Sequence, residues 1–294
     1  MRTDLQAGIY SAAEVPMGDY LADPCVLPSL SSGAAHRIIT TTPRHVWWSH
    51  PRLGGHARES SSRTDMGSVA HELVLGNSDA IAIVDADDWR TKAAQTMGDE
   101  ARAHGKYPVL RHKFHDAQQM ALAAKAFVAD SMYAGVFDSG AGEATAIVQL
   151  SEWTWLRARP DWLNHDMRVC LHYKTTEGSA APDPFVRWVL TSMGYDVSMA
   201  FYKLVLDRLS DEFREWSHVI LLQEQKAPYC CSLITLSPAA WAIADSKVQR
   251  AILRWGMCMA TDKWPGYGGQ VHEAEPTPWQ LAEAEQKLQE MGSE

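Results

Sequence analysis

The sequence lacks several features that mark particular protein classes. It has no window of 18 or more apolar residues and no basic-then-apolar leader, so we expect neither a membrane span nor a signal peptide, and we infer a cytoplasmic protein without a membrane partner. Its five cysteines are an odd number without a CxxC pair, which argues against a disulfide framework and a zinc ribbon.

Basic residues are also in the minority. The chain carries 27 Lys and Arg against 36 Asp and Glu, a formal net charge of −9. Because nucleic-acid-binding proteins usually present a basic surface, this balance opposes such a role unless basic residues line a local surface. A metal site needs clustered carboxylates, and these count toward the acidic total.

The chain is long enough to bury a sizeable core, with 294 residues of which 46% are hydrophobic and 21% charged. Its patterns predict a single domain of the α/β (α+β) class over residues 1–294. Residues 1–135 are rich in helical signals, residues 136–265 mix strand and helix signals, and residues 266–294 form a helical tail.

Three successive runs between residues 143 and 176 predict a β-meander: EATAIVQL, WTWLRARP and MRVCLHYKTT. Strand alternation sends residues i and i+2 to the same face, so His172 and Lys174 project together. Asp161 follows Pro160 in a turn, and a strand pair joined by the polar loop 162–168 brings it opposite His172. A carboxylate, a second metal-capable side chain and a lysine are the working parts of a metal-dependent phosphodiesterase.

A helix is predicted for residues 65–76 (DMGSVAHELVLG), with His71 on a partly buried face and a glycine at the end. Each candidate also has a purely structural interpretation. His71 could be a hydrogen-bonded residue of the core boundary, Asp161 a turn former, Lys174 a strand-edge residue and Glu143 a solvated strand end. Their joint occurrence favours a shared site.

An ordered series of motifs runs from residue 8 to about residue 265: GIYSAAEVPMGDYL, SLSSGAA, MGSVAHELVL, RTKAAQ, GEATAIV, RARPDWL, HYKTT and DVSMAFYKL. In this order the motifs resemble the RecE-type phage exonucleases, in the RecB-like branch of the PD-(D/E)XK nucleases. The resemblance implies a restriction-endonuclease-like core in which helices flank a central mixed β-sheet.

The resemblance also implies roles for five residues, carried over by position. His71 is the helical histidine that binds metal, Glu143 the acidic residue of the first core strand, and Asp161 the main metal-bridging carboxylate. Lys174 orients or activates the attacking water. Tyr202 matches the tyrosine of a glutamine-x-x-x-tyrosine helix motif.

Two positions depart from the family pattern. The family usually has Asp or Glu where this chain has His172, and Gln where it has Ser198. The expected cofactor is Mg²⁺ or Mn²⁺, and a metal face of His71, Asp161 and His172 favours Mn²⁺, because magnesium prefers oxygen ligands and is poorly served by imidazole. The hypothesis of a metal-dependent hydrolase requires both imidazoles to converge with the carboxylate of Asp161 on one ion.

The activity that the resemblance implies is 5′ to 3′ exonuclease digestion of linear double-stranded DNA, which leaves 3′ single-stranded overhangs for recombination. Such proteins act as ring-shaped homo-oligomers beside a single-strand annealing protein, in the cytoplasm of a bacterium that carries the phage or prophage. The residues that we expect to contact DNA are Arg44, Trp47, Trp48, Arg63 and Ser198.

Two alternatives stay open at this stage. The histidine at position 172 could leave a catalytically impaired nuclease fold that binds DNA ends or an annealing partner. A third interpretation is an endonuclease that acts on branched or single-stranded DNA.

Overall fold

The computed structural model describes residues 2–56, 66–186, 190–271 and 273–291. Within these ranges the strands form three sheets of five, four and two strands. The five-stranded sheet is central and has the order β11-β10-β9-β8-β5, with β9 and β10 parallel and the other pairs antiparallel. Its strands are β5 (Ala141–Gly142), β8 (Trp162–Asn164), β9 (Val169–Thr176), β10 (Ser217–Glu224) and β11 (Cys231–Ile234).

Strands from the N-terminal segment complete the four-stranded sheet, whose order is β1-β6-β7-β2. The outer strands pair with the β6–β7 hairpin, β1 antiparallel to β6 and β2 parallel to β7. A separate parallel pair joins β3 and β4. The bounds are β1 (Gly8–Tyr10), β2 (Ser29–Ser31), β3 (Ile81–Val84), β4 (Tyr107–Leu110), β6 (Thr145–Ser151) and β7 (Thr154–Ala158).

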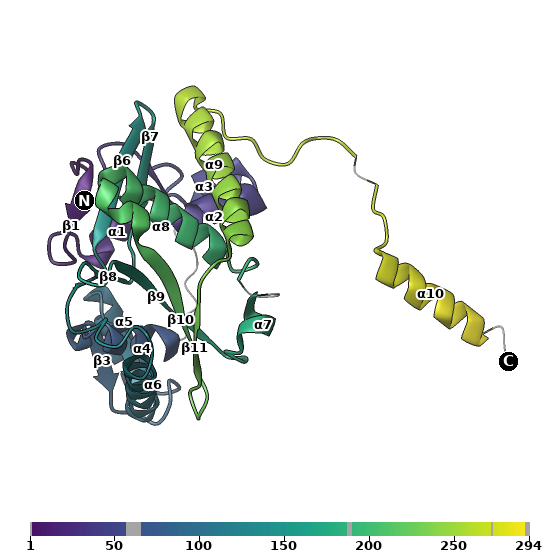
Figure 1. Cartoon of the computed structure of the whole chain (residues 1–294). Coiled ribbons are helices and arrows are strands. Elements are labelled where there is room, and N and C mark those ends of the chain that lie inside the picture. The colour runs from purple at the N-terminus through teal and green to yellow at the C-terminus, as the bar shows by residue number, and fades with distance from the viewer. Residues whose placement is uncertain (1, 57–65, 187–189, 272, 292–294) are drawn as a thin grey trace.

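Helices surround the sheets (Figure 1). The α-helices are α1 (Met17–Ala22), α2 (Ser32–Thr40), α3 (Pro43–Ser49), α4 (Met66–Val74), α5 (Lys92–Ala103), α6 (Arg111–Ala129), α7 (Pro182–Pro184), α8 (Tyr195–Leu209), α9 (Pro238–Thr261) and α10 (Pro278–Met291). Short 3₁₀ turns span Ser78–Ala80 and Asp211–Glu215. In the part of the chain that is described, none of the helices combines the length and the apolar composition that a bilayer span needs.

The central sheet is buried on both faces. Cys170, Ile220 and Leu222 belong to one core cluster with α2, α8 and α9, whereas Leu171 and Leu221 belong to another with α4 and α6. Strands covered on both faces carry nearly continuous apolar runs, which accounts for the apolar centres of β9 and β10. By contrast, α10 lies apart from the body at the end of an extended segment, and none of its residues is buried (Figure 1).

The expected fold class is confirmed, since mixed sheets are flanked by helices. The three predicted strands are β6, β7 and β9, but the single meander is wrong: β6 and β7 belong to the four-stranded sheet and β9 to the central one. The predicted helix over residues 65–76 is α4, followed by Gly76 at φ +79°. A single helix over residues 185–209 would also be expected from the apolar spacing, yet α8 begins only at Tyr195, after Gly194 at φ +72°.

Candidate functional site

The site is assembled where the chain crosses from one sheet to the other. Strand β7 ends at Ala158 in the four-stranded sheet and β8 begins at Trp162 in the central sheet, so Asp161 lies at the crossing. Trp162 pairs with Leu171 across the β8–β9 hairpin. The predicted loop 162–168 is therefore wrong at its start, since its first three residues are strand β8, and β7 pairs with β6 and β2 instead of β9. The backbone N–H of Glu143 donates to the carbonyl oxygen of Asp161 at 3.0 Å and holds the crossing in place.

The carboxylate of Asp161 is the centre of the site. Its Oδ2 accepts hydrogen bonds from the backbone N–H of Tyr173 and from Nζ of Lys174, both at 2.8 Å. Its Oδ1 lies 3.4 Å from Nε2 of His71, which α4 carries. Bonds of this kind to charged groups are stronger than neutral ones, so the position of the carboxylate is well fixed.

Two further carboxylates stand beside His71. Its Nδ1 lies 3.6 Å from Oε1 of Glu72, and one donor atom each from His71, Glu72 and Glu143 lies within 4.8 Å of the other two. Glu143 adopts φ +51°, a conformation that costs a residue with a Cβ about 1–2 kcal/mol. Arg159 donates to its carboxylate at 3.3 Å. Backbone strain at a side chain that faces a pocket is typical of functional sites.

These side chains line an open pocket of about 500 Å³. Its walls come from α4, the crossing segment, β9 and α8. Besides the residues already described, they include Tyr20, Tyr107, Arg159 and Tyr202. A concave, polar pocket with converging charged groups is the expected setting for a binding or catalytic site.

Opposing charges shift the pKa values in this pocket. Burial alone would raise the pKa of Asp161, but the ammonium of Lys174 and the imidazole of His71 outweigh burial and hold that pKa well below its ordinary value. Burial lowers the pKa of His71, but Asp161 and Glu72 raise it to about 9. At neutral pH the pocket therefore pairs an Asp161 carboxylate with a His71 imidazolium.

The donor set fits a hard divalent cation. Three carboxylates and one imidazole face the pocket, and oxygen-rich sets of this kind suit Mg²⁺ and Mn²⁺. Burial and the neighbouring Glu72 raise the pKa of Glu143 against the opposing effect of Arg159, so negative charges are crowded here and a cation would relieve the repulsion. A metal that binds His71 must displace the proton from its ring.

The structure places most of the predicted catalytic residues in one pocket. His71, Glu143, Asp161 and Lys174 all line it, although they come from segments up to about 100 residues apart in the sequence. Tyr202 lines the same pocket, and its hydroxyl accepts a hydrogen bond from Oγ of Ser32 at 3.3 Å.

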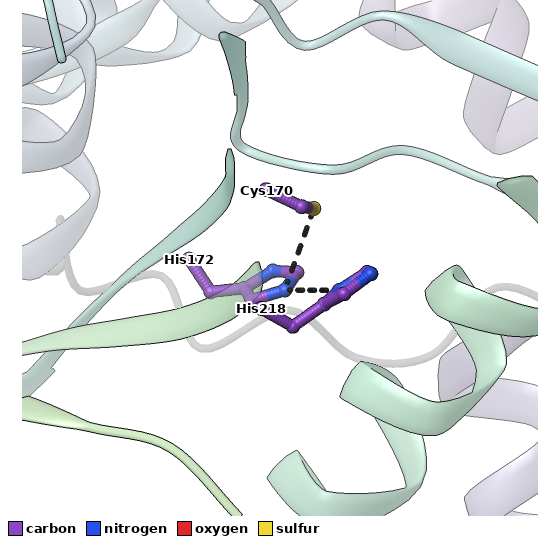
Figure 2. Close-up of side chains that lie close together, drawn as sticks. All are labelled: Cys170, His172 and His218. Atoms are coloured by element: carbon purple, nitrogen blue, oxygen red, sulfur yellow. Dashed lines mark hydrogen bonds between the residues drawn. The ribbon is translucent and has the colours of Figure 1, made fainter. Parts of the chain in front are cut away.

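The prediction that His71, Asp161 and His172 face one metal ion is wrong for His172. The imidazole of His172 is 2% exposed, and its Nε2 lies 3.6 Å from Sγ of Cys170 and 3.5 Å from Nδ1 of His218 (Figure 2). The two imidazoles therefore belong to different groups, His71 with carboxylates and His172 with a thiol and a second imidazole.

Strand geometry explains this correction. Alternation does put His172 and Lys174 on the same face of β9, but the long lysine side chain reaches the carboxylate of Asp161, whereas the shorter imidazole stays in the core under α8. The convergence of His71, Asp161 and His172 on which the hydrolase hypothesis depended is therefore not met, and neither is the condition for a preference for Mn²⁺. The group that does form beside His71 contains the carboxylates of Glu72 and Glu143.

The residues expected to contact DNA are dispersed. Ser198 lines a smaller cavity next to the pocket, whereas Arg44, Trp47 and Trp48 lie on α3 and line neither. The guanidinium of Arg44 covers the ring of Trp47 at 4.8 Å, and Trp48 is 51% exposed. Arg63 falls outside the described residues.

Sequence analysis missed Glu72 and Arg159 as site residues. Glu72 follows His71 directly, and adjacent helical residues do not face each other, so no argument from one helix face joins them. They enter the same pocket because α4 packs against β9, which pairs with β8 directly after the crossing segment. Arg159 did carry a signal, since it lies just after β7, two residues from Arg157, and directly precedes Pro160 and Asp161.

Comparison with known proteins identifies the family. Residues 53–275 match the model described as "PDDEXK-like domain of unknown function (DUF3799)". The chain belongs to this family. The matched residues include every segment that lines the pocket except α1, which carries Tyr20. Membership of a PDDEXK-like family supports a nuclease.

A solved structure has the same fold. The chain is similar to a protein from Eubacterium rectale named "Putative exonuclease", at a TM-score of 0.56 and 13% sequence identity, over 95% of this chain and 98% of that chain. At this identity the likeness shows the fold alone. No curated protein sequence matches the chain.

Proposed function

We propose that this DUF3799 protein is a metal-dependent deoxyribonuclease of the RecE-like type, an exonuclease that digests linear double-stranded DNA from 5′ to 3′ and leaves 3′ overhangs for recombination. The observation that carries the proposal is the carboxylate of Asp161, held between His71 and Lys174 in a pocket with two further carboxylates. Family membership and the name of the similar E. rectale protein support a nuclease.

The residues that would hold the cation are His71, Glu72, Glu143 and Asp161, and Mg²⁺ and Mn²⁺ both suit them. When bound, the cation polarises a phosphoryl oxygen and lowers the pKa of a bound water molecule. Arg159 keeps the carboxylate of Glu143 in its orientation through the 3.3 Å hydrogen bond.

Lys174 would contribute electrostatic catalysis. Its ammonium lies 2.8 Å from the central carboxylate, so it is positioned to orient the attacking water and to offset the negative charge that develops on the phosphoryl group. Tyr202 lines the same pocket, from α8. A ring-shaped homo-oligomer, a single-strand annealing partner and a phage or prophage origin in a bacterial cytoplasm belong to the same proposal.

The deciding assay follows a linear duplex labelled at its 5′ or 3′ ends, with a covalently closed circle beside it, in Mg²⁺, Mn²⁺ or chelator. We expect metal-dependent release of acid-soluble nucleotides from the linear duplex, starting at its 5′ ends, and an intact circle. Asp161→Asn should abolish the release, and Lys174→Gln should lower its rate about 10²–10³-fold. Lys125→Gln, which changes an exposed lysine on α6, is the matched control and should keep it.

A cut circle would contradict the exonuclease and favour the endonuclease. Release of nucleotides from 3′ ends alone would contradict the proposed polarity.

His172 favours a second candidate, a nuclease fold that binds DNA ends or an annealing partner without cleaving. The side chain at this acidic position of the family pattern faces Cys170 and His218 instead of the pocket, so it supplies no ligand there. Retention of linear duplex in a gel-shift assay, without nucleotide release in either metal, would support this candidate. A gain of Mg²⁺-dependent cleavage in His172→Asp would show that the histidine is the impairing change.

A further inference from the structure

A thiol and two imidazoles meet in the core behind the pocket. Cys170 and His172 project from the same face of β9 because they are two residues apart, and His218 is in register with Cys170 on the parallel strand β10. All three residues are at most 2% exposed. Figure 2 shows their donor atoms grouped around Nε2 of His172, and one donor atom of each lies within 4.8 Å of the other two.

The spacing of these atoms matches the edges of a tetrahedral metal site. With Zn–N of ~2.0–2.1 Å and Zn–S of ~2.3 Å, two nitrogen ligands lie about 3.3 Å apart and a nitrogen and a sulfur about 3.6 Å apart. The observed separations are 3.5 Å from His172 Nε2 to His218 Nδ1 and 3.6 Å from His172 Nε2 to Cys170 Sγ. Small shifts of the two rings would therefore complete the coordination.

Hydrogen bonding alone accounts poorly for this cluster. The contact between Nε2 of His172 and Nδ1 of His218 is 3.5 Å, longer than the usual range for a hydrogen bond from N–H, whereas the 3.6 Å contact to the sulfur is of ordinary length. Burial lowers the pKa of both imidazoles, so both rings are neutral and each has a lone pair to offer.

We propose that Cys170, His172 and His218 form a second metal site, for a zinc-class ion, separate from the carboxylate pocket. Of the three residues, His172 also lines a cavity of about 200 Å³. A water molecule would be the fourth ligand. One thiolate and two imidazoles suit Zn²⁺ and Co²⁺ and do not suit Mg²⁺, so this site does not take the magnesium that suits the carboxylate pocket. The proposal goes beyond the nuclease function and stands independently of it.

Binding at this site releases one proton. Burial raises the pKa of the Cys170 thiol, so the metal-free side chain is S–H. When the metal–sulfur bond forms, the S–H bond breaks and the proton goes to solvent, while the neutral imidazoles release none. Affinity for Zn²⁺ should therefore rise about tenfold for each unit of pH in the neutral range.

The test uses the full chain, purified without chelator, and two measurements. Elemental analysis gives the zinc content per chain, and titration of the metal-free protein with Co²⁺ gives the d–d bands of tetrahedral cobalt and the thiolate-to-cobalt charge-transfer band. We expect one zinc per chain and both spectral features. Cys170→Ser and His218→Gln should each lower the affinity for zinc at least ~10-fold and remove the charge-transfer band. In Cys170→Ser the band disappears because the sulfur ligand is gone.

The matched controls separate this site from its surroundings. Cys258→Ser changes another buried cysteine of the same core cluster, and His71→Gln removes the histidine of the carboxylate pocket; both should keep the zinc and the spectrum. A wild-type protein that gives no charge-transfer band with Co²⁺ would overturn the proposal, whether or not the variants fold. Zinc content unchanged in Cys170→Ser would also overturn it. Neither measurement depends on DNA cleavage.

Discussion

The charge arrangement of the pocket can be tested by replacing Asp161 with Asn. Asn has nearly the same shape, and its amide oxygen can still accept the hydrogen bond from the backbone N–H of Tyr173, but the negative charge is gone. Burial lowers the pKa of His71, whereas Asp161 and Glu72 raise it to about 9 from the ordinary 6.5. The substitution removes the larger of the two raising effects.

We expect the pKa of His71 to fall below 6.5 in Asp161→Asn, because burial and the ammonium of Lys174 then outweigh the remaining effect of Glu72. The drop from about 9 to 6.5 corresponds to about 3 kcal/mol. A group whose pKa is raised on folding stabilises the fold fully at pH values below its pKa in the unfolded chain. This contribution is lost as the pH rises through its pKa in the folded state. The metal-free wild type should therefore lose up to about 3 kcal/mol of stability between about pH 6.5 and pH 9 and beyond, and Asp161→Asn should not.

The assay is an NMR pH titration of the histidine ring protons in chelator, with His71→Gln to assign the signal and Asp130→Asn as an exposed control. Denaturant unfolding across the same pH range measures the stability. If the pKa of His71 stays near 9 in Asp161→Asn, the ion pair at 3.4 Å does not control the charge of this imidazole, and the reasoning is refuted.

Four further outcomes are expected. Lys174→Gln should lower kcat about 10²–10³-fold at saturating Mg²⁺ with little change in Tm, and a loss that appears only in KM would contradict its part in the chemical step. Glu72→Gln should raise the Mg²⁺ concentration for half-maximal cleavage about tenfold, which a metal titration would detect; an unchanged midpoint would remove Glu72 from the ligands. At subsaturating Mg²⁺ the cleavage rate should rise with pH up to about 9, because the metal must displace the proton of His71, and a flat profile would exclude His71 as a ligand. Gly194→Ala should lower the free energy of unfolding by at least about 1 kcal/mol, since Gly194 has φ +72° and an added Cβ would lie 2.5 Å from the ring of His36; unchanged denaturant unfolding would argue against the helix break.

Local patterns predicted several elements correctly. The apolar centre of β9 and the helix that carries His71 each follow from neighbouring residues alone. The turn predicted at Pro160 is only a bend at Asp161, and the turn that leads into β9 lies at residues 165–168. Short strands such as β1 and β2 were missed, because three residues are too few to show an alternation and their pairing partners lie more than 120 residues away.

The sequence by itself determined which residues are capable of the chemistry and, through strand alternation, that His172 and Lys174 share a face. Only the tertiary structure decided which other side chains each of them contacts. Register with β10 places His218 beside His172, and the packing of α4 against β9 brings Glu72 into the same pocket as Glu143 and Asp161. The physical reason is that alternation fixes the direction of a side chain within its own strand, whereas its partners are fixed by contacts between segments far apart in the chain, which no local pattern encodes.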